Sequence, residues 1–364
     1  MAIRNFFGYD DVPMPTGEQV SASVSLAPLP FTFKPGSAVA KGGVTYTKDG
    51  GWLKCTGSVD VSPSGINKSN YTTNLLQELG FGVNPQVITI GVRWLCPMNV
   101  GLVVNWPHPF AIPNSATLNS GTIAAGSPFS FGSIPDWVAG KEYYLEAQYD
   151  FAALVIRRRV DGVPISDMAI HPAIPPLVTA GTARLIMGTF GSATIAGNIE
   201  YSFWFKDMYL IEKTSDGTAD SFLGPQQVVP ISVASLDQAA WLPTGAADPV
   251  TALNTAITDS ASLATPVVTT DVANNIGNIG LSMPSFFGQV NGVLLNATGR
   301  RKDGASGGIV AQVTSGSDNS TQKTVALTNA MVPGYKLYLA EKSPSGVRWT
   351  RTALQAAQLK LTVA

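Results

Sequence analysis

Apolar and polar positions alternate along much of the chain, which is the pattern of strands that bury one face. Residues 142–149 alternate in this way, whereas residues 87–96 form a nearly continuous β-branched run that ends at Pro97. We predict a half-buried strand for the first segment and a strand buried between two sheets for the second. Eight or more strands are expected across residues 43–212.

Turn-forming pairs join several of these strands into hairpins. Asp49-Gly50 separates two strand-like segments, and Asp161-Gly162 separates residues 154–160 from residues 163–165. Asp and Gly accept the left-handed backbone conformations that two-residue hairpin loops require. We therefore predict a hairpin at each pair.

Helical signals are short. Residues 74–80 begin with Asn at the N-cap and end with Gly after at most two turns, which makes them the best helix candidate in the first half. Asp248 and Pro249 suit the cap and the first turn of another short helix, which extends to Leu253. The sequence contains no heptads and no short repeat that would form a fibre shaft. The expected fold class is all-β.

A polar, turn-forming segment at residues 214–220 divides the chain. We assign residues 1–217 to an N-terminal arm and a lectin-like domain, a concanavalin-like jelly-roll sandwich. Residues 218–364 are assigned to a smaller C-terminal β-sandwich domain, preceded by a long loop-rich segment. A length of 364 residues suits two cores better than one. The expected C-terminal strands are residues 290–297, 309–313, 324–327, 335–341 and 359–363.

Charge excludes several partners. Charged residues make up 13% of the chain and the formal net charge is −1. The largest basic cluster, Arg157-Arg158-Arg159, is too small to neutralise a nucleic-acid backbone, so DNA and RNA are not expected partners. No apolar run is long enough to cross a bilayer, and the start lacks the features of a secretion signal. We expect a soluble protein made in the cytoplasm, with no membrane insertion.

Residues with catalytic or metal-binding chemistry are few. The two histidines, His108 and His171, lie beside prolines in predicted loops, and the two cysteines, Cys55 and Cys96, lie in predicted strands. Residues 304–308 fit the pattern of a nucleophile elbow but precede a strand, where that motif requires a helix. We therefore assign no catalytic residue, no cofactor site and no metal site.

Paired carboxylates leave one alternative open, because jelly rolls also host glycosidases. Glu142 with Glu146, or Glu200 with Asp207, are candidates for two acids across a sugar-binding groove, but we favour solvent-facing positions on half-exposed strands. Calcium is a second open question, since no loop concentrates the several oxygen ligands that it needs. The aspartates in or near turns are Asp49, Asp60, Asp161 and Asp167.

Tryptophans crowd the first domain, which holds five of the seven in the chain. One tryptophan ring buries a large apolar area, so we assign Trp94 and Trp204, which lie in predicted strands, to the core. Trp106 and Trp137 lie in predicted loops. They are the candidate pair for stacking on the sugar rings of a glycan.

Three parts of the sequence resemble structural proteins of long-tailed bacteriophages. Residues 146–163 look like the strand, Val-Asp-Gly turn and strand of laminin-G or concanavalin-like domains. Residues 203–211 and 220–229 are similar to a phage junction of aromatic residues, Asp and Tyr, followed by Asn-Asp-Phe-Leu-Gly-Asp-x-Arg-Val. Gly224-Pro225-Gln226-Gln227 departs from that pattern, so a charge interaction is expected to be lost. The third part resembles the strand set that ends these proteins: residues 290–294, 299–302, 335–338 and 349–350.

The resemblance implies a non-enzymatic structural component of a bacteriophage particle, placed in the neck or collar, the tail, the baseplate or the capsid surface. Such a protein acts through subunit packing, so its expected partners are other virion proteins and copies of itself in a homo-oligomer. The alternative is a receptor-binding protein that recognises a host surface glycan through the jelly-roll domain. A depolymerase is a third and less favoured interpretation.

Overall fold

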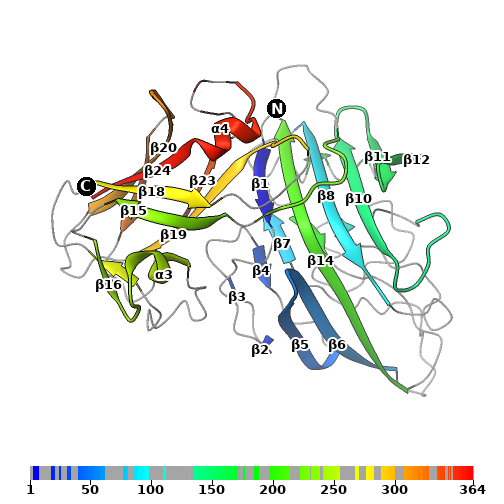
Figure 1. The fold of residues 1–364 in the computed structure, drawn as a ribbon. Coiled ribbons are helices and arrows are strands. Elements are labelled where there is room, and N and C mark those ends of the chain that lie inside the picture. The colour runs from blue at the N-terminus through cyan, green and yellow to red at the C-terminus, as the bar shows by residue number, and fades with distance from the viewer. Residues whose placement is uncertain are drawn as a thin grey trace. The chain divides into compact units, whose positions relative to one another are not determined.

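The computed structural model divides into two units, which separate between Val228 and Val229 (Figure 1). It describes residues 3–7, 18–20, 24–25, 31–33, 40–61, 77–80, 86–97, 110–111, 131, 134–170, 172, 175–176, 184–187, 197–213, 222–229, 231–237, 241–254, 267–269, 276–282, 288–299, 307–320, 322–327, 334–340, 343, 345 and 347–363. Within these ranges, the helices are all too short or too polar to span a membrane.

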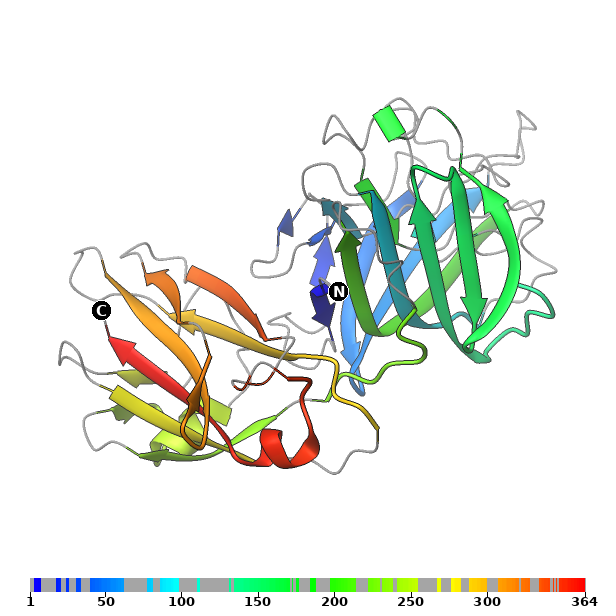
Figure 2. The ribbon, with the colours of Figure 1, turned by 90° about the horizontal axis from the view of Figure 1, so that it is seen from above.

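A nine-stranded antiparallel sheet dominates the first unit, with its strands in the order β12, β11, β10, β8, β14, β6, β5, β2 and with β1 paired to β14. Figure 2 shows these strands side by side. We call it the large sheet. Its strands are β1 (Ile3–Phe7), β2 (Glu18–Val20), β5 (Ala40–Asp49), β6 (Trp52–Val61), β8 (Val87–Leu95), β10 (Glu142–Asp150), β11 (Val155–Val160), β12 (Val163–Ala169) and β14 (Gly197–Lys213).

A second sheet in this unit has five strands in the order β3, β4, β7, β13, β9. They are β3 (Val24–Ser25), β4 (Phe31–Phe33), β7 (Gln77–Gly80), β9 (Phe110–Ala111) and β13 (Arg184–Met187). From β6 to β14 the chain passes repeatedly from one sheet to the other, which is the connectivity of a jelly-roll sandwich. The predicted all-β fold is confirmed.

The predicted helix at residues 74–80 is wrong over its described part, because Gln77–Gly80 forms strand β7. This strand pairs with β4 on one side and β13 on the other. A helix of at most two turns has little stability of its own, so pairing within a sheet outweighs the local capping signals.

The large sheet has one apolar and one polar face. Along β8, the side chains of Ile88, Ile90, Val92 and Trp94 are fully buried. They share a face with the apolar residues of β10, because successive side chains of a strand alternate between faces. We call this the inner face and the opposite one the outer face. The assignment of Trp94 to the core is confirmed.

The predicted hairpins form, one of them displaced by a residue. At the β11–β12 hairpin, Asp161 and Gly162 have φ angles of 50° and 80° and occupy the loop, as predicted. At the β5–β6 hairpin the loop is Gly50-Gly51, and Asp49 instead pairs with Trp52. The displacement leaves the Asp49 side chain on the sheet.

The second unit is built on a six-stranded sheet, in which β15, β18, β24, β20 and β21 follow one another and β22 pairs with β20. Its strands are β15 (Ser232–Asp237), β18 (Ile276–Ser282), β20 (Gly307–Ser315), β21 (Asp318–Asn319), β22 (Lys323–Leu327) and β24 (Ala357–Val363). Two further pairs are β16 (Leu242–Thr244) with β17 (Val267–Thr269), and β19 (Val293–Gly299) with β23 (Gly334–Ala340).

All five predicted C-terminal strands are present, as β19, β20, β22, β23 and β24. The predicted short helix forms as α3 (Pro249–Asn254), and the Asp248 carboxylate accepts the backbone N–H of Thr251 at 2.8 Å. A second short helix, α4 (Arg351–Gln355), begins after the N-cap Thr350. Trp349, before it, is buried in a core with Val313 and Leu354.

Candidate functional site

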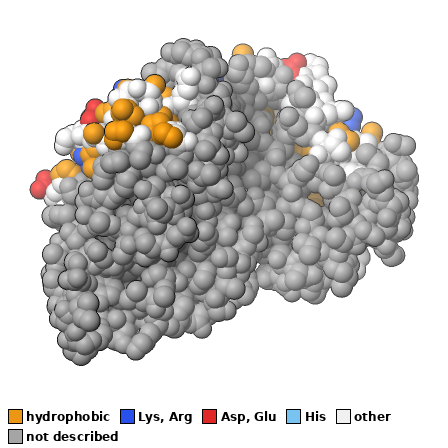
Figure 3. Space-filling view, turned by 180° about the vertical axis from the view of Figure 1, so that it is seen from behind, with side chains coloured by type: hydrophobic (Ala, Val, Ile, Leu, Met, Phe, Trp, Pro, Cys, Tyr) orange, Lys and Arg blue, Asp and Glu red, His pale blue; other side chains and the backbone are white. Residues whose placement is uncertain are grey.

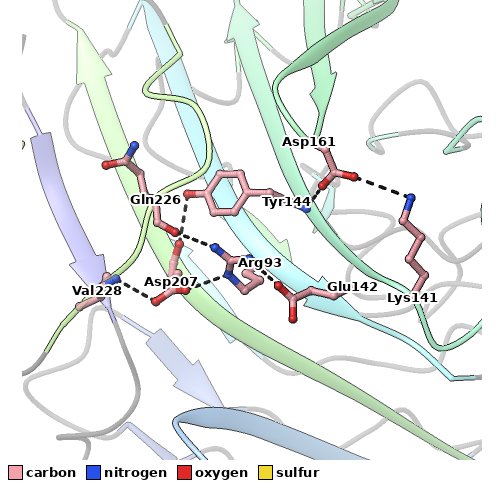
Figure 4. Close-up of polar contacts among 8 residues, drawn as sticks. All are labelled: Arg93, Lys141, Glu142, Tyr144, Asp161, Asp207, Gln226 and Val228. Carbon is pink, nitrogen blue, oxygen red and sulfur yellow. Dashed lines mark hydrogen bonds and ion pairs between the residues drawn. The ribbon is translucent and has the colours of Figure 1, made fainter. Parts of the chain in front are cut away.

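A short segment after β14 lies on the outer face of the large sheet. We call this segment, residues 222–228, the strap. It belongs to the first unit, which therefore extends beyond residue 217, where we predicted the domain boundary. Figure 4 shows Gln226 and Val228 of the strap beside the polar residues of β8, β10 and β14.

Glu146 and Tyr209 hold the first part of the strap. The Glu146 carboxylate Oε1 accepts the backbone N–H of Gly224 at 2.9 Å and also the hydroxyl of Tyr209. The Tyr209 oxygen in turn accepts the backbone N–H of Leu223 at 3.2 Å. Glu146 and Tyr209 are both buried, and the Arg159 guanidinium lies 4.4 Å from the ring centroid of Phe222. Two buried side chains thus satisfy two backbone donors of the strap.

Asp207 and Arg93 hold the last part of the strap. Asp207 Oδ1 accepts the backbone N–H of Val228 at 2.8 Å, and its Oδ2 accepts Arg93 Nε at 2.9 Å. Arg93 donates through Nη2 to the carbonyl of Gln226 at 3.2 Å and pairs through Nη1 with Glu142. The guanidinium therefore joins two carboxylates of the sheet to the backbone of the strap (Figure 4).

A β-bulge in β14 directs Asp207 toward the strap. The register between β14 and β8 shifts between Lys206 and Tyr209, and Asp207 has a φ of 50°. Aspartate accepts this left-handed conformation more readily than most residues other than glycine. The Tyr144 hydroxyl donates to the Asp207 backbone carbonyl at 3.2 Å, which supports the bulge from β10. Bulges commonly re-aim a side chain in this way.

Gly91 makes room for the ring of Tyr209. These two residues face each other in the β8–β14 register. A Cβ atom at position 91 would lie only 2.1 Å from Tyr209 Cε1. A glycine within a strand otherwise rich in β-branched residues often marks such a close approach.

Burial opposes ionisation of the two carboxyl groups beneath the strap. It raises the pKa of Glu146, although the hydrogen bonds from Tyr209 and Gly224 act in the opposite direction. It also raises the pKa of Asp207, against the hydrogen bonds from Val228 and Arg93. Glu146 Oε2 is buried and has no hydrogen-bond partner among the described residues. Burial thus favours the protonated form of both groups in the folded state, and Glu146, unlike Asp207, has no described cation bonded to its carboxyl group.

We expect opening of the strap to increase with pH through the titration of Glu146. A raised pKa in the folded state stabilises the closed strap fully below the usual value of 4.5, and this contribution is lost as the pH rises through the raised value. Amide exchange of Gly224 should then increase with pH more steeply than intrinsic exchange does. Glu146→Gln keeps the shape but cannot ionise, so the excess dependence should vanish. An unchanged pH profile in this variant would rule out Glu146 as its source.

The two tryptophans proposed for glycan stacking are not brought together by the described structure. Trp106 lies outside the described residues. Trp137 is only 7% exposed, so its ring offers little surface to a sugar ring in this conformation. Trp204, which we assigned to the core, is instead only partly buried. Because it pairs with Lys54 and Leu95, it lies on the outer face.

The proposed carboxylate pairs have other contacts. Glu142 and Glu146 do share the outer face, but Glu142 pairs with Arg93 while Glu146 binds the strap. Asp207 binds the strap as well, and the Glu200 side chain lies outside the described residues. The solvent-facing positions that we favoured are wrong for Glu146 and Asp207, which are buried and accept backbone N–H groups.

Two of the four aspartates considered for calcium binding accept N–H groups of the protein. Asp49 accepts the indole N–H of Trp204 at 3.0 Å, and Asp161 accepts the backbone N–H of Tyr144 at 2.7 Å. Asp167 is exposed, and the Asp60 side chain lies outside the described residues. In the described ranges no three His, Cys, Asp or Glu residues are grouped as metal ligands would be. His108, His171 and the Cys55 side chain lie outside those ranges, and Cys96 is buried.

The sequence analysis named Glu146 and Asp207 only as candidate acids and Tyr209 only within the phage resemblance, and it gave Arg93 no role. One signal was available, since an arginine and a glycine interrupt the apolar run of residues 87–96. The charge interaction that we expected to be lost at Gly224-Pro225-Gln226-Gln227 is one made by side chains. The strap is bound mainly through its backbone, and Gln226 offers its carbonyl to Arg93.

No known protein family and no curated protein matches this sequence. Solved structures do match it. An endo-1,3-beta-glucanase from Streptomyces sioyaensis has 10% identity and a TM-score of 0.33, over 59% of this chain and 97% of the glucanase. A sialidase has 16% identity and a TM-score of 0.33, over 57% of this chain but only 19% of the sialidase.

A structure of botulinum neurotoxin type C, whose cell entry depends on two ganglioside molecules, has 11% identity and a TM-score of 0.27, over 96% of this chain and 93% of the toxin chain. The glucanase and its like are jelly-roll sandwich proteins. At these identities and scores the likeness carries no argument about activity or ligand. The class assigned to the first unit, a jelly-roll sandwich, follows from its own strand order.

Proposed function

We propose that this chain is a non-enzymatic structural protein of a tailed-bacteriophage particle and acts through subunit packing. The observation that carries the proposal is the bonding of Glu146 and Asp207, the buried acids of the outer face. Both accept backbone N–H groups of the strap, and Asp207 also binds Arg93. Groups arranged in this way hold a segment in place and are not poised for acid–base chemistry.

The same residues carry the resemblance to the phage junction. Asp207 and Tyr209 supply its Asp and Tyr, and residues 222–224 supply its Phe-Leu-Gly. In the folded chain these separate parts contact one another, since Tyr209 accepts from Leu223 and Asp207 accepts from Val228. These contacts explain the residues of the junction motif by a structural role, with no catalytic step, and this supports the proposal.

An apolar surface at the edge of the large sheet also supports packing against other subunits. Figure 3 shows apolar side chains at the upper left, where the β11–β12 hairpin lies. Val163 of β12 is 63% exposed, and Ile165 and Met168 of the same strand are partly exposed. Exposed apolar patches of this kind commonly become buried between protein surfaces. Among the described strands β12 is the last of the sheet, so no described strand pairs with its outer edge.

Immunogold labelling of intact particles tests this proposal. Antibodies against the purified chain should place gold at one recurrent position on the particle, because symmetric packing repeats the subunit at fixed sites. Quantitative mass spectrometry of the same particles should find several copies of the chain in each. Purified particles that lack the chain would contradict the proposal.

A second candidate function is recognition of a host surface glycan through the jelly-roll unit. The observation that favours it is the partial exposure of Trp52 and Trp204 on the outer face, where neither ring belongs to the buried core. Aromatic side chains flanked by a few polar groups are typical of ligand sites. Both functions are compatible with one virion protein.

A further inference from the structure

Five side chains form a patch on the outer face, on β5, β6 and β14. Asp49 pairs with Trp52, and Lys54 pairs with Trp204 in the strand register. Lys206 follows Trp204 by two residues and pairs with Arg93, so it shares the same face. We call these residues, Asp49, Trp52, Lys54, Trp204 and Lys206, the tryptophan–lysine patch.

Contacts within the patch position both indole rings. Trp204 donates its indole N–H to Asp49 Oδ2 at 3.0 Å, and Lys54 Nζ lies 5.0 Å from the centroid of the Trp204 ring. Lys206 Nζ lies 5.9 Å from the centroid of the Trp52 ring. Each contact is a weak cation–π or hydrogen-bonding interaction, but together they restrict the rings before any ligand binds. Such restriction lowers the entropic cost of binding.

Neither ammonium group of the patch has a described carboxylate within ion-pair distance, although Asp207 attracts Lys206 electrostatically. Neither Lys54 nor Lys206 forms an ion pair within the described part of the chain, whose four ion pairs involve Arg93, Lys141 and Arg157. Asp49 is the acid of the patch, and it is engaged by the Trp204 indole. The patch therefore presents two cations beside two partly exposed aromatic rings.

This chemistry fits an acidic sugar better than a protein surface. The centres of protein interfaces are depleted in lysine, whereas here lysines alternate with the aromatic rings. The apolar face of a pyranose ring packs on an indole, and its carboxylate or sulfate pairs with an ammonium group. Asp49 is exposed and adds an acceptor for sugar hydroxyls.

We propose that the tryptophan–lysine patch binds an acidic glycan, one whose sugar rings carry carboxylate or sulfate groups. Trp52 and Trp204 provide the stacking surface, and Lys54 and Lys206 select for the negative charge. The inference rests on the second candidate function, recognition of a host glycan, and names both the place and the class of that ligand. The proposed pair Trp106 and Trp137 is not required.

Calorimetric titration of the full-length protein with oligogalacturonate, a chain of uronic acids, tests the inference. Neutral galacto-oligosaccharide of similar length and polyglutamate are the comparison ligands. The double variant Lys54→Glu/Lys206→Glu should weaken oligogalacturonate binding at least about tenfold, since each attraction becomes a repulsion. Lys141→Glu/Arg348→Glu makes the same change in net charge at exposed positions outside the patch, and it should bind as the original protein does.

Each outcome bears on a different part of the inference. Binding that the patch variant leaves unchanged would place the glycan elsewhere and retain the second candidate function. Equal affinity for the neutral sugar would overturn the acidic class, and equal affinity for polyglutamate would reduce the interaction to charge alone. Absence of binding to either sugar would overturn the inference and leave only the packing function. Trp52→Ala should also weaken binding if stacking contributes, with folding verified by circular dichroism.

Discussion

Replacing Asp207 with alanine should lower the free energy of opening of the first unit by about 3 kcal/mol. The change removes the acceptor of the Val228 N–H and one of the two carboxylates bound to Arg93. A charge left without its partner in a buried site commonly costs about 3–5 kcal/mol. We expect the lower end, because the Arg93 side chain is 25% exposed and retains Glu142.

Hydrogen exchange of the amides in β8 and β10 measures this opening separately from the second unit. Asp207→Asn is the matched variant, since Asn tolerates the positive φ and still accepts a hydrogen bond but carries no charge. It should cost less than the alanine variant. Asp150→Ala breaks the more exposed pair with Arg157 and should cost about 1 kcal/mol or less. If Asp207→Ala and Asp150→Ala lowered the free energy of opening equally, the result would contradict the role assigned to Asp207.

Replacing Gly91 with alanine should destabilise the first unit by about 3 kcal/mol, the upper part of the usual range for an overpacked core position. The new Cβ would lie 2.1 Å from the Tyr209 ring. The ring cannot simply move aside, because its hydroxyl binds both Glu146 and Leu223. In calorimetry, a loss of this size should lower the melting temperature of the first unit by roughly 6–12 °C.

A double variant separates the clash from other effects of the substitution. In a protein that already carries Tyr209→Ala the ring is absent. Adding Gly91→Ala should then lower the free energy of unfolding further by less than about 0.5 kcal/mol. Additive losses from the two substitutions would show that alanine at position 91 destabilises the sheet for a reason other than the ring of Tyr209.

Much of the fold is predictable from local sequence. The Asp161-Gly162 turn, the strand at residues 142–149 and the Asp248-Pro249 helix start are each determined by neighbouring residues. The half-buried character predicted from the alternation in residues 142–149 is wrong, because residues 143–149 are all buried. The exception at residues 74–80 has a non-local cause. Weak capping signals there lose to pairing of β7 with strands distant in sequence.

The candidate site was much harder to predict, because its contacts join distant parts of the chain. Arg93, Glu146 and Asp207 lie on three strands, and they meet only through strand register. The bulge at Asp207 decides which way its carboxylate points, and no local sequence rule specifies that bulge. Trp204 was misassigned for a similar reason, since strand membership alone does not tell which face a side chain occupies.

The buried acids Glu146 and Asp207, together with Tyr209, hold the strap as part of the folded sheet, a claim that can be tested by amide exchange of Leu223, Gly224 and Val228 in the intact protein. These three amides should exchange about as slowly as those of β8 and β10, because their hydrogen bonds open only when the outer face does. Exchange at the rate of an unstructured peptide, with β8 and β10 still protected, would contradict the claim.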